Sequence, residues 1–445
     1  MKTLLLPDKY IITAIGDGKL PALGAVCRPS LFALPVKLGE KELVFNTFTR
    51  QLIEPGELKS LFTAQKSFVY NADDARIDEL IKARFIVNND TDEAALLSSG
   101  LKIIHLLGKK DSKKHGAFVI LPTTACNARC FYCYEAGIEY KTMDDATADE
   151  TVKYILATKM PGKIGIRWFG GEPLVASSVI DRIVDGLNAN GVEFSSSIIT
   201  NASLMTRETA KKAVEDWQVK SAQITLDGRR QEYLKRKAYV DASRDHYAAA
   251  LDAALTLNEL GVSVSIRLNA DEGNIDDLML LADELKTVFE GCKRIKVYVV
   301  DMYLPCGKKY SHEDNVLFYS RLEALQNKLN DLELCRSDDL PRLRTHRCMA
   351  DMPNGASVIA PDGSLYSCEH MIEASRIGSL YDYESESDLR RSFVEDNTRA
   401  QNRPDCLTCV YLPECTLSDH CPISVRDCKM NVHLNILRKL LHFSG

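Results

Sequence analysis

The sequence predicts an α/β protein whose centre is a partial (β/α)6 TIM-like barrel, flanked by a small α+β domain and a cysteine-rich domain. Strand and helix patterns alternate six times between residues 117 and 331. Residues 1–100 carry strand patterns followed by short helices, and cysteines concentrate after residue 345. The length of 445 residues also exceeds that of one ordinary domain.

The N-terminal domain is predicted at residues 1–100. β-forming residues in "SLFALPVKL" and "KELVFNTFTRQL" flank the turn "GEK" and predict a hairpin. "GELKSLF" and "DARIDELIKARFIV" have the apolar spacing of short helices. A linker is expected at 101–116, because its basic run "GKKDSKKHG" is more typical of a solvated segment than of a binding surface.

The barrel is predicted at residues 117–305. Each of its β-branched, apolar strands is followed by an amphipathic helix, which implies parallel strands joined by right-handed crossovers. Eight such units would close a barrel, so six predict an open one. A flat, doubly wound sheet is the alternative that the pattern leaves open. The predicted strands are 117–123, 163–171, 193–201, 221–228, 262–270 and 294–302.

The periodicity breaks after the last unit. We expect a bridging region at 306–345, a cysteine-rich domain at 346–430 and a C-terminal helix at 431–445. "ASVIAPDGSLYSC" predicts a hairpin that turns at Pro-Asp-Gly. The apolar stripe of "NVHLNILRKLLHFSG" is typical of a helix that docks on a core.

Composition limits the function. The net charge of −6 disfavours a nucleic-acid enzyme, and no run of 18 apolar residues predicts a membrane span. The start, "MKTLLLPDKY", is too short for a signal peptide, so we expect a cytoplasmic protein. Fourteen cysteines in that compartment indicate metal or cluster ligands rather than disulfides. Four isolated ones are expected to be buried thiols: Cys27, Cys292, Cys306 and Cys335.

Unusual residues follow the predicted strands at their carboxyl ends, where parallel α/β folds place their active sites. A three-cysteine loop follows the first strand, and "GGEP" ends the second. The ends of the later strands carry Thr200 and Asn201, then Asp227, then Arg267 and Asn269, then Asp301. These residues would therefore gather at one mouth of the barrel.

The loop "CNARCFYC" places Cys126, Cys130 and Cys133 within eight residues. Three thiolates at this spacing can hold three irons of a 4Fe–4S cluster and leave the fourth iron open to a ligand. An amino-acid-like ligand could chelate that iron through its amino and carboxylate groups. A structural zinc site is the alternative, but it would need a fourth ligand at short spacing.

"CNARCFYC" followed by "GGEP" resembles the radical S-adenosylmethionine (SAM) superfamily over residues 117–305. In that family the open iron binds SAM, and one electron cleaves SAM to methionine and a 5′-deoxyadenosyl radical that takes a hydrogen atom from the substrate. The resemblance implies that the backbone of Gly170, Gly171 and Glu172, in the motif completed by Pro173, holds the methionine amino group. Tyr132 would lie beside the adenine.

Four further positions gain roles from the resemblance. Asn201 would contact the ribose or carboxylate of SAM. Arg267 and Asn269 are candidates for cofactor contacts, since Arg267 suits a carboxylate. Asp227 is the candidate catalytic residue. The alternative for Asp227, Arg267 and Asn269 is a role as buried hydrogen-bonding residues.

The second cysteine group resembles the SPASM domain, the C-terminal module of many peptide-modifying radical SAM enzymes, which carries two auxiliary 4Fe–4S clusters. One cluster would be held by Cys406, Cys409, Cys415 and Cys428. The other would be held by Cys348, Cys368 and Cys421, with Cys335, Cys306 or an open iron completing it. Five residues separate Cys415 from Cys421 where three are usual, which puts Cys421 in doubt. A zinc ribbon is the alternative for this group.

Together these features predict a peptide maturase with three 4Fe–4S clusters and SAM. The N-terminal domain is similar to the winged-helix element that binds leader peptides, so the partners would be a ribosomal precursor peptide and a reductant such as flavodoxin or ferredoxin. An intramolecular thioether is the favoured product, with a carbon–carbon or carbon–oxygen cross-link as the alternative. A sulfatase-maturating enzyme is the second hypothesis, and a zinc or electron-transfer binding protein is the third.

Overall fold

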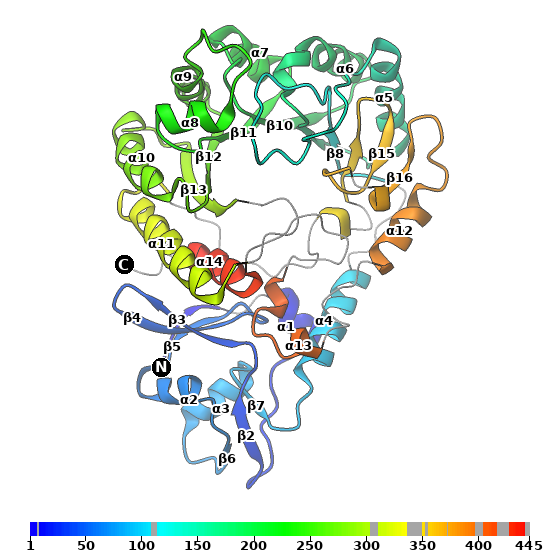
Figure 1. The fold of residues 1–445 in the computed structure, drawn as a ribbon. Helices are drawn as coiled ribbons and strands as arrows, with labels where there is room; N and C mark the ends of the chain where they lie inside the picture. The colour runs from blue at the N-terminus through cyan, green and yellow to red at the C-terminus, as the bar shows by residue number, and fades with distance from the viewer. Residues whose placement is uncertain are drawn as a thin grey trace.

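Six parallel strands, in the same order in space as in the sequence, form the centre of the molecule (Figure 1). The computed structural model describes residues 1–6, 9–107, 114–302, 310–335, 349–351, 355–371, 373–396, 404–415 and 427–440. The strands are β8 (Ala117–Ile120), β9 (Ile164–Trp168), β10 (Phe194–Thr200), β11 (Val219–Thr225), β12 (Ser263–Ala270) and β13 (Ile295–Asp301). A doubly wound sheet would reverse its strand order midway, so the partial barrel is confirmed.

Helices cover one face of this curved sheet (Figure 1). Alternate strand residues such as Val297 and Val299 point to them and are buried, whereas Lys296 on the other face is exposed. The inner face of the barrel is therefore open to water in part. The covering helices are α5 (Asp145–Thr158), α6 (Ser177–Ala189), α7 (Arg207–Glu215), α8 (Arg230–Lys237), α9 (His246–Glu259), α10 (Ile275–Val288) and α11 (His312–Asp331).

The cysteine-rich region extends the barrel sheet. The predicted hairpin is present, and its first strand pairs in parallel with β8, Val358 opposite Val119. This extension of the sheet was not predicted, because a three-residue strand carries too short a pattern to reveal its neighbour. The elements are η3 (Met349–Asp351), β14 (Ser357–Ile359), β15 (Ser364–Tyr366), η4 (Glu373–Ser375), β16 (Arg376–Ser379), α12 (Glu386–Asp396), α13 (Pro404–Leu407) and η6 (Leu412–Glu414).

The N-terminal domain is α+β, as predicted, but it contains two small sheets. One has the order β1-β5-β4-β3 and includes the predicted hairpin, with Leu38 opposite Lys41; the other has the order β6-β2-β7. Helix α4 continues over residues 101–107, which were expected to be linker. The elements are β1 (Lys2–Leu5), α1 (Lys9–Ile15), β2 (Val26–Pro29), β3 (Ala33–Leu38), β4 (Lys41–Asn46), β5 (Leu52–Glu54), η1 (Gly56–Leu58), α2 (Lys59–Ala64), β6 (Phe68–Val69), α3 (Ala75–Lys82), β7 (Ile86–Asn88) and α4 (Glu93–Leu107).

The C-terminal helix α14 (Cys428–Leu440) packs against two other parts of the chain, the N-terminal domain and α11. Val432, Ile436 and Leu437 are buried against the sheet β1-β5-β4-β3 of the N-terminal domain. On another side, Arg438 donates from Nε to Gln326 of α11 at 3.0 Å. The predicted docking role of this helix is confirmed, and its position beside α11 and above β3 is visible in Figure 1. Among the described residues, no helix has the length and apolar character needed to cross a bilayer.

The loop between Cys406 and Cys415 is also fixed to the N-terminal domain. Thr47, in the turn after β4, donates from its hydroxyl to the carbonyl of Val410 at 2.7 Å. Arg50, in the same turn, forms a buried ion pair with Glu414. Leu412 packs beside Phe48 in a separate apolar cluster. The cysteine-rich loop is therefore part of the surface that holds the N-terminal domain in place.

Candidate active site

The three-cysteine loop follows β8 at the mouth of the barrel, as predicted. A turn brings Cys130 and Cys133 together, with the amide of Cys133 donating to the carbonyl of Cys130 at 3.1 Å. Burial, together with the nearby charges of Glu172, Cys130 and Cys133, raises the pKa of Cys126 to about 12. The three thiols therefore lie close to one another in a partly buried site.

The donor set of this loop suits an iron–sulfur cluster. Three thiols in a Cys-x3-Cys-x2-Cys loop can each bind a different iron of a 4Fe–4S cluster and leave the fourth iron open. A structural zinc ion would need a fourth ligand at short spacing.

The "GGEP" segment packs directly on the chain that enters this loop. The amide of Gly171 donates to the Thr123 carbonyl at 3.1 Å, and the amide of Glu172 to the Ala125 carbonyl at 2.9 Å. A Cβ atom on Gly171 would lie 2.4 Å from the Ala125 carbonyl oxygen. Glycine permits this approach. Because the amides are used internally, the backbone carbonyls are the groups that this segment can offer to an ammonium.

The packing predicts a specific effect of Gly171→Ala. The new methyl group would meet backbone oxygens of both Thr124 and Ala125, which cannot rotate away. We expect a loss of about 1–3 kcal/mol in unfolding free energy, measured by chemical denaturation, together with weaker iron loading. Gly165→Ala in β9 is the control, since its nearest contact would be an ordinary 3.7 Å to Ala117. Equal unfolding free energy and equal iron content in the two variants would contradict this interpretation of the packing.

Glu172 links the ends of β9 and β10 through its side chain. Oε1 accepts from the Thr200 hydroxyl at 2.6 Å and the Leu174 amide at 3.2 Å, and Oε2 accepts from the Asn201 amide at 2.8 Å. Burial raises the pKa of this carboxyl group. Pro173 begins the short helix η2 (Pro173–Ala176) that Glu172 caps. The Glu172 side chain thus has a structural role, while a backbone contact to SAM stays a prediction.

Asn201 lies beside the first cysteine. Its Nδ2 donates to Oδ1 of Asn127 at 2.8 Å and lies 4.0 Å from the sulfur of Cys126. Its Oδ1 accepts from the Ser203 hydroxyl at 2.7 Å. Asn127 and Ser203 were not predicted as site residues; they complete a polar cluster that the end of β10 shares with the three-cysteine loop.

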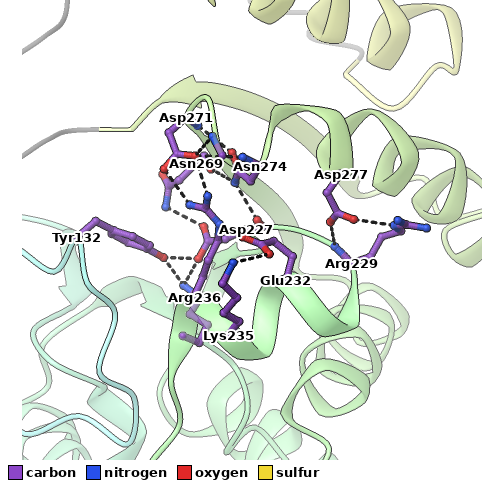
Figure 2. Close-up of polar contacts among 12 residues, drawn as sticks. Tyr132, Asp227, Arg229, Glu232, Lys235, Arg236, Asn269, Asp271, Asn274 and Asp277 are labelled. Carbon is purple, nitrogen blue, oxygen red and sulfur yellow. Dashed lines mark hydrogen bonds and ion pairs between the residues drawn. The ribbon is translucent and has the colours of Figure 1, made fainter.

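Asp227 is at the centre of a buried network at the end of β11. Tyr132 donates from its hydroxyl to Oδ2 of Asp227, and Nδ2 of Asn269 donates to Oδ1 at 3.2 Å. Arg267 in turn donates from Nε to Oδ1 of Asn269 at 2.9 Å. Figure 2 shows Tyr132 reaching from its loop toward Asp227, and Asn269 reaching the same carboxylate from above. The structure therefore brings four predicted site residues into one network.

Lys237 belongs to this network and was missed by the sequence analysis. Its ammonium group lies 2.8 Å from the Tyr132 hydroxyl and 3.1 Å from Oδ2 of Asp227, and its side chain is only 5% exposed. Burial lowers the pKa of Lys237, but the charges of Asp227 and Tyr132 outweigh burial and hold it well above its ordinary value. Lys237 ends the run "RRQEYLKRK", whose polar composition carries no local sign of this burial.

Four of the predicted auxiliary ligands also come together. The amide of Cys409 donates to the carbonyl of Cys406 at 3.0 Å. Burial raises the pKa of Cys428, and the charges of Asp427, Cys415, Cys409 and Cys406 raise it further. These four cysteines therefore lie in one region of the fold, between α13 and the start of α14, and a shared metal centre stays a prediction.

The other predicted set is less complete. Cys368 follows β15, whereas Cys348, Cys421 and Cys306 lie outside the described residues. Cys292 and Cys335 pack against the barrel core but are only partly buried, so the expectation of buried thiols is wrong for these two. Cys27 is buried in the N-terminal domain, as expected.

An aromatic contact connects Cys368 to the mouth of the barrel. Tyr134 stacks on Phe169, the residue before Gly170, with ring centres 5.9 Å apart. Its other neighbour is His370, at 4.5 Å between ring centres. The sequence did not reveal this contact, because it joins three segments far apart in the chain. It places the Cys368 segment beside the three-cysteine loop.

Comparisons with known proteins agree with this site. Residues 120–285 match the model of the radical SAM superfamily. A serine-type anaerobic sulfatase-maturating enzyme of Klebsiella aerogenes is 23% identical over 301 residues, covering 58% of this chain and 67% of that protein. A GTP 3′,8-cyclase of Alkaliphilus metalliredigens is 31% identical over 155 residues, covering 34% and 48%. The first curated relatives are matched over 40% to 67% of their length.

Two solved structures share the fold. The structure of anSMEcpe with bound AdoMet has a TM-score of 0.56 at 15% identity, covering 74% of this chain and 97% of that chain. Streptococcus suis SuiB bound to S-adenosylmethionine has a TM-score of 0.50 at 14% identity, covering 92% of this chain and 99% of that chain.

The barrel, the three-cysteine loop and the glycine segment define a cofactor-dependent α/β barrel enzyme. Residues 120–285, which include most of the barrel and the three-cysteine loop, are similar to the radical SAM superfamily.

Proposed function

We propose that this protein is a radical SAM maturase that installs an intramolecular cross-link, preferably a thioether, in a ribosomally made precursor peptide. The observation that carries the proposal is the packing of the Cys126–Cys133 loop on "GGEP" at the barrel mouth, with His370 of the Cys368 segment beside Tyr134. When bound there, SAM and a 4Fe–4S cluster would supply a radical that removes a hydrogen atom from the peptide. The chain's own residues position this cofactor and shape its surroundings.

Three features assign roles to the chain's residues. Cys126, Cys130 and Cys133 would hold the cluster. Carbonyls of the "GGEP" segment would accept from the SAM ammonium, and Asn201, whose Nδ2 is 4.0 Å from the Cys126 sulfur, would contact the ribose or carboxylate of SAM. Asp227 and Lys237 hold Tyr132 in place, next to Cys133. The proposal also includes two auxiliary clusters in the C-terminal region. It further includes a flavodoxin or ferredoxin as the electron donor, in the cytoplasm.

The N-terminal domain supports a peptide substrate. Its sheet β6-β2-β7 has two short edge strands, and Val69 on one edge is 62% exposed. An extended leader peptide could add a strand to such an edge. SuiB, a protein solved with its precursor peptide SuiA, matches 90% of this chain with a TM-score of 0.50. That coverage is larger than the 74% matched by anSMEcpe.

A sulfatase-maturating enzyme is the second candidate. It is favoured by the relative from Klebsiella aerogenes, which matches 58% of this chain. The N-terminal domain distinguishes the two candidates, because a leader-binding element has no evident use on a sulfatase. A carbon–carbon or carbon–oxygen cross-link fits the same site, and the peptide product would decide between these bonds.

Metal content tests the proposal first. After anaerobic purification with iron and sulfide supplied, three clusters predict about 12 irons per chain, and the variant C126A/C130A/C133A should retain about 8. The parent, reduced in the presence of SAM, should form 5′-deoxyadenosine, and the variant should form none. Zinc in place of iron would overturn the radical proposal and favour a binding protein.

A further inference from the structure

Helix α8 and the residues that follow it hold the three-cysteine loop at three points. The amide of Arg129 donates to the carbonyls of Lys237 and Ala238, at 2.8 and 3.1 Å. The amide of Val240 donates to the carbonyl of Asn127 at 2.9 Å. The third point is the Lys237 ammonium on the hydroxyl of Tyr132. Backbone and side chain of Lys237 thus contact the loop on both sides of Cys130.

Helix α8 ends at Ala238, whose backbone is left-handed with φ of 47°. This conformation turns the carbonyls of Lys237 and Ala238 toward the three-cysteine loop. The helix itself is fixed from behind. Arg236 forms a bidentate pair with Asp271, at 2.7 and 3.0 Å, and also bonds Glu232 at 2.7 Å. Figure 2 shows this second layer of contacts behind Asp227. Lys237 therefore projects from a support that is itself immobilised.

Lys237 and Asp227 are opposite charges buried next to the loop. The Asp227 side chain is fully buried, and its two oxygens contact Asn269, Tyr132 and Lys237. Charges in such low-dielectric surroundings act strongly on their neighbours. Asp227 is needed to orient Tyr132, but alone its negative charge would make a nearby metal centre harder to reduce. The ammonium group of Lys237 compensates for that charge.

We propose that Lys237 is a positioning residue of the three-cysteine loop and that its buried charge keeps the reduction potential of the loop's metal centre within reach of its electron donor. This inference rests on the proposed function only in assuming a cluster at Cys126, Cys130 and Cys133. Net charge and hydrogen bonding around a cluster are the means by which a protein sets its potential. A simple ion pair that only stabilises the barrel is the competing explanation.

The two explanations differ in the sign of their effects. Lys237→Met removes the positive charge and should shift the one-electron reduction equilibrium of the metal centre at least tenfold toward the oxidised state. This shift corresponds to a reduction potential that is at least 59 mV more negative. Asp227→Asn leaves the positive charge and should shift the potential in the opposite direction. The double variant K237M/D227N restores neutrality and should return close to the parent. Loss of packing alone would not produce opposite signs.

The experiment is an anaerobic potentiometric titration of the full chain, followed by electron paramagnetic resonance. The signal of the relevant centre is the one that changes when SAM is added and is missing from C126A/C130A/C133A. Iron is counted in each preparation. If K237M loads no iron at this site, K237R keeps the charge and should restore both the iron and a near-parental potential.

The possible results separate the hypotheses. A parent chain without iron at Cys126, Cys130 and Cys133 would defeat the proposed function itself. Iron in every variant, with potentials that are unchanged or shift in one direction for both K237M and D227N, would overturn only the inference about Lys237. If K237M lacks iron at this site and K237R folds but lacks it as well, the charge at position 237 is not what supports the metal centre. Lys237 would then have only a packing role.

Discussion

Replacing Glu414 with Gln should lower the free energy of unfolding by about 3–5 kcal/mol, because it leaves the charge of Arg50 buried without its carboxylate. The two side chains are 1% and 3% exposed, and they join the turn after β4 to the loop that ends at Cys415. Glu414 also forms an ion pair with Lys439 of α14, with 3.2 Å between Oε2 and Nζ. One substitution thus weakens the contact between three segments of the chain.

Chemical denaturation measures this loss, and amide hydrogen exchange locates it. Exchange should accelerate in β3, β4 and α14. Glu42→Gln is the matched control, because its pair with Lys59 joins two half-exposed side chains and should contribute nothing measurable. The double change R50M/E414L removes both charges and should recover most of the stability. An E414Q variant as stable as the parent would contradict the structural role of this ion pair.

The barrel and its cysteine loop were predictable because their signals are local. The strands alternate with amphipathic helices, and the three cysteines lie within eight residues of "CNARCFYC". Active sites of parallel α/β barrels lie at the carboxyl ends of the strands. This placement alone predicted that Asn201, Asp227 and Asn269 lie at the same mouth of the barrel. The structure confirms this gathering and adds the hydrogen bonds that join Asp227 to Asn269 and Tyr132.

Residues whose role depends on distant partners were not predictable. Lys237 stands in a basic run of α8, whose polar composition carries little apolar periodicity, and its burial depends on Asp227 and on Tyr132 of the three-cysteine loop, 105 residues away. The ion pair of Arg50 and Glu414 spans most of the chain in the same way. The short strand β14 joins the barrel sheet through pairing that no local pattern encodes.

The second large effect concerns the auxiliary cysteines. Changing Cys406, Cys409 and Cys415 to Ala should remove about four irons and also release the N-terminal domain, whereas C126A/C130A/C133A should remove a similar number and leave that domain unchanged. The reason is position: Val410 and Tyr411, between two of the changed cysteines, pack on the sheet of β3 and β4.

A metal centre at these cysteines would fix the loop in the shape that the N-terminal domain contacts. Without it, ordering the loop would cost about 1–2 kcal/mol of backbone entropy per residue, and this cost would oppose docking. Cys428, the fourth member, is the first residue of α14, so the same loss would free the start of that helix.

Hydrogen exchange under anaerobic conditions distinguishes the two cysteine variants. We expect faster exchange in β3, β4 and α14 for C406A/C409A/C415A only, and faster exchange of the 123–142 segment for C126A/C130A/C133A only. Equal exchange of the N-terminal domain in both variants would show that this domain docks without the auxiliary centre. The expected difference would instead mean that a metal centre at these cysteines has a structural role, since it would hold the N-terminal domain in its docked position.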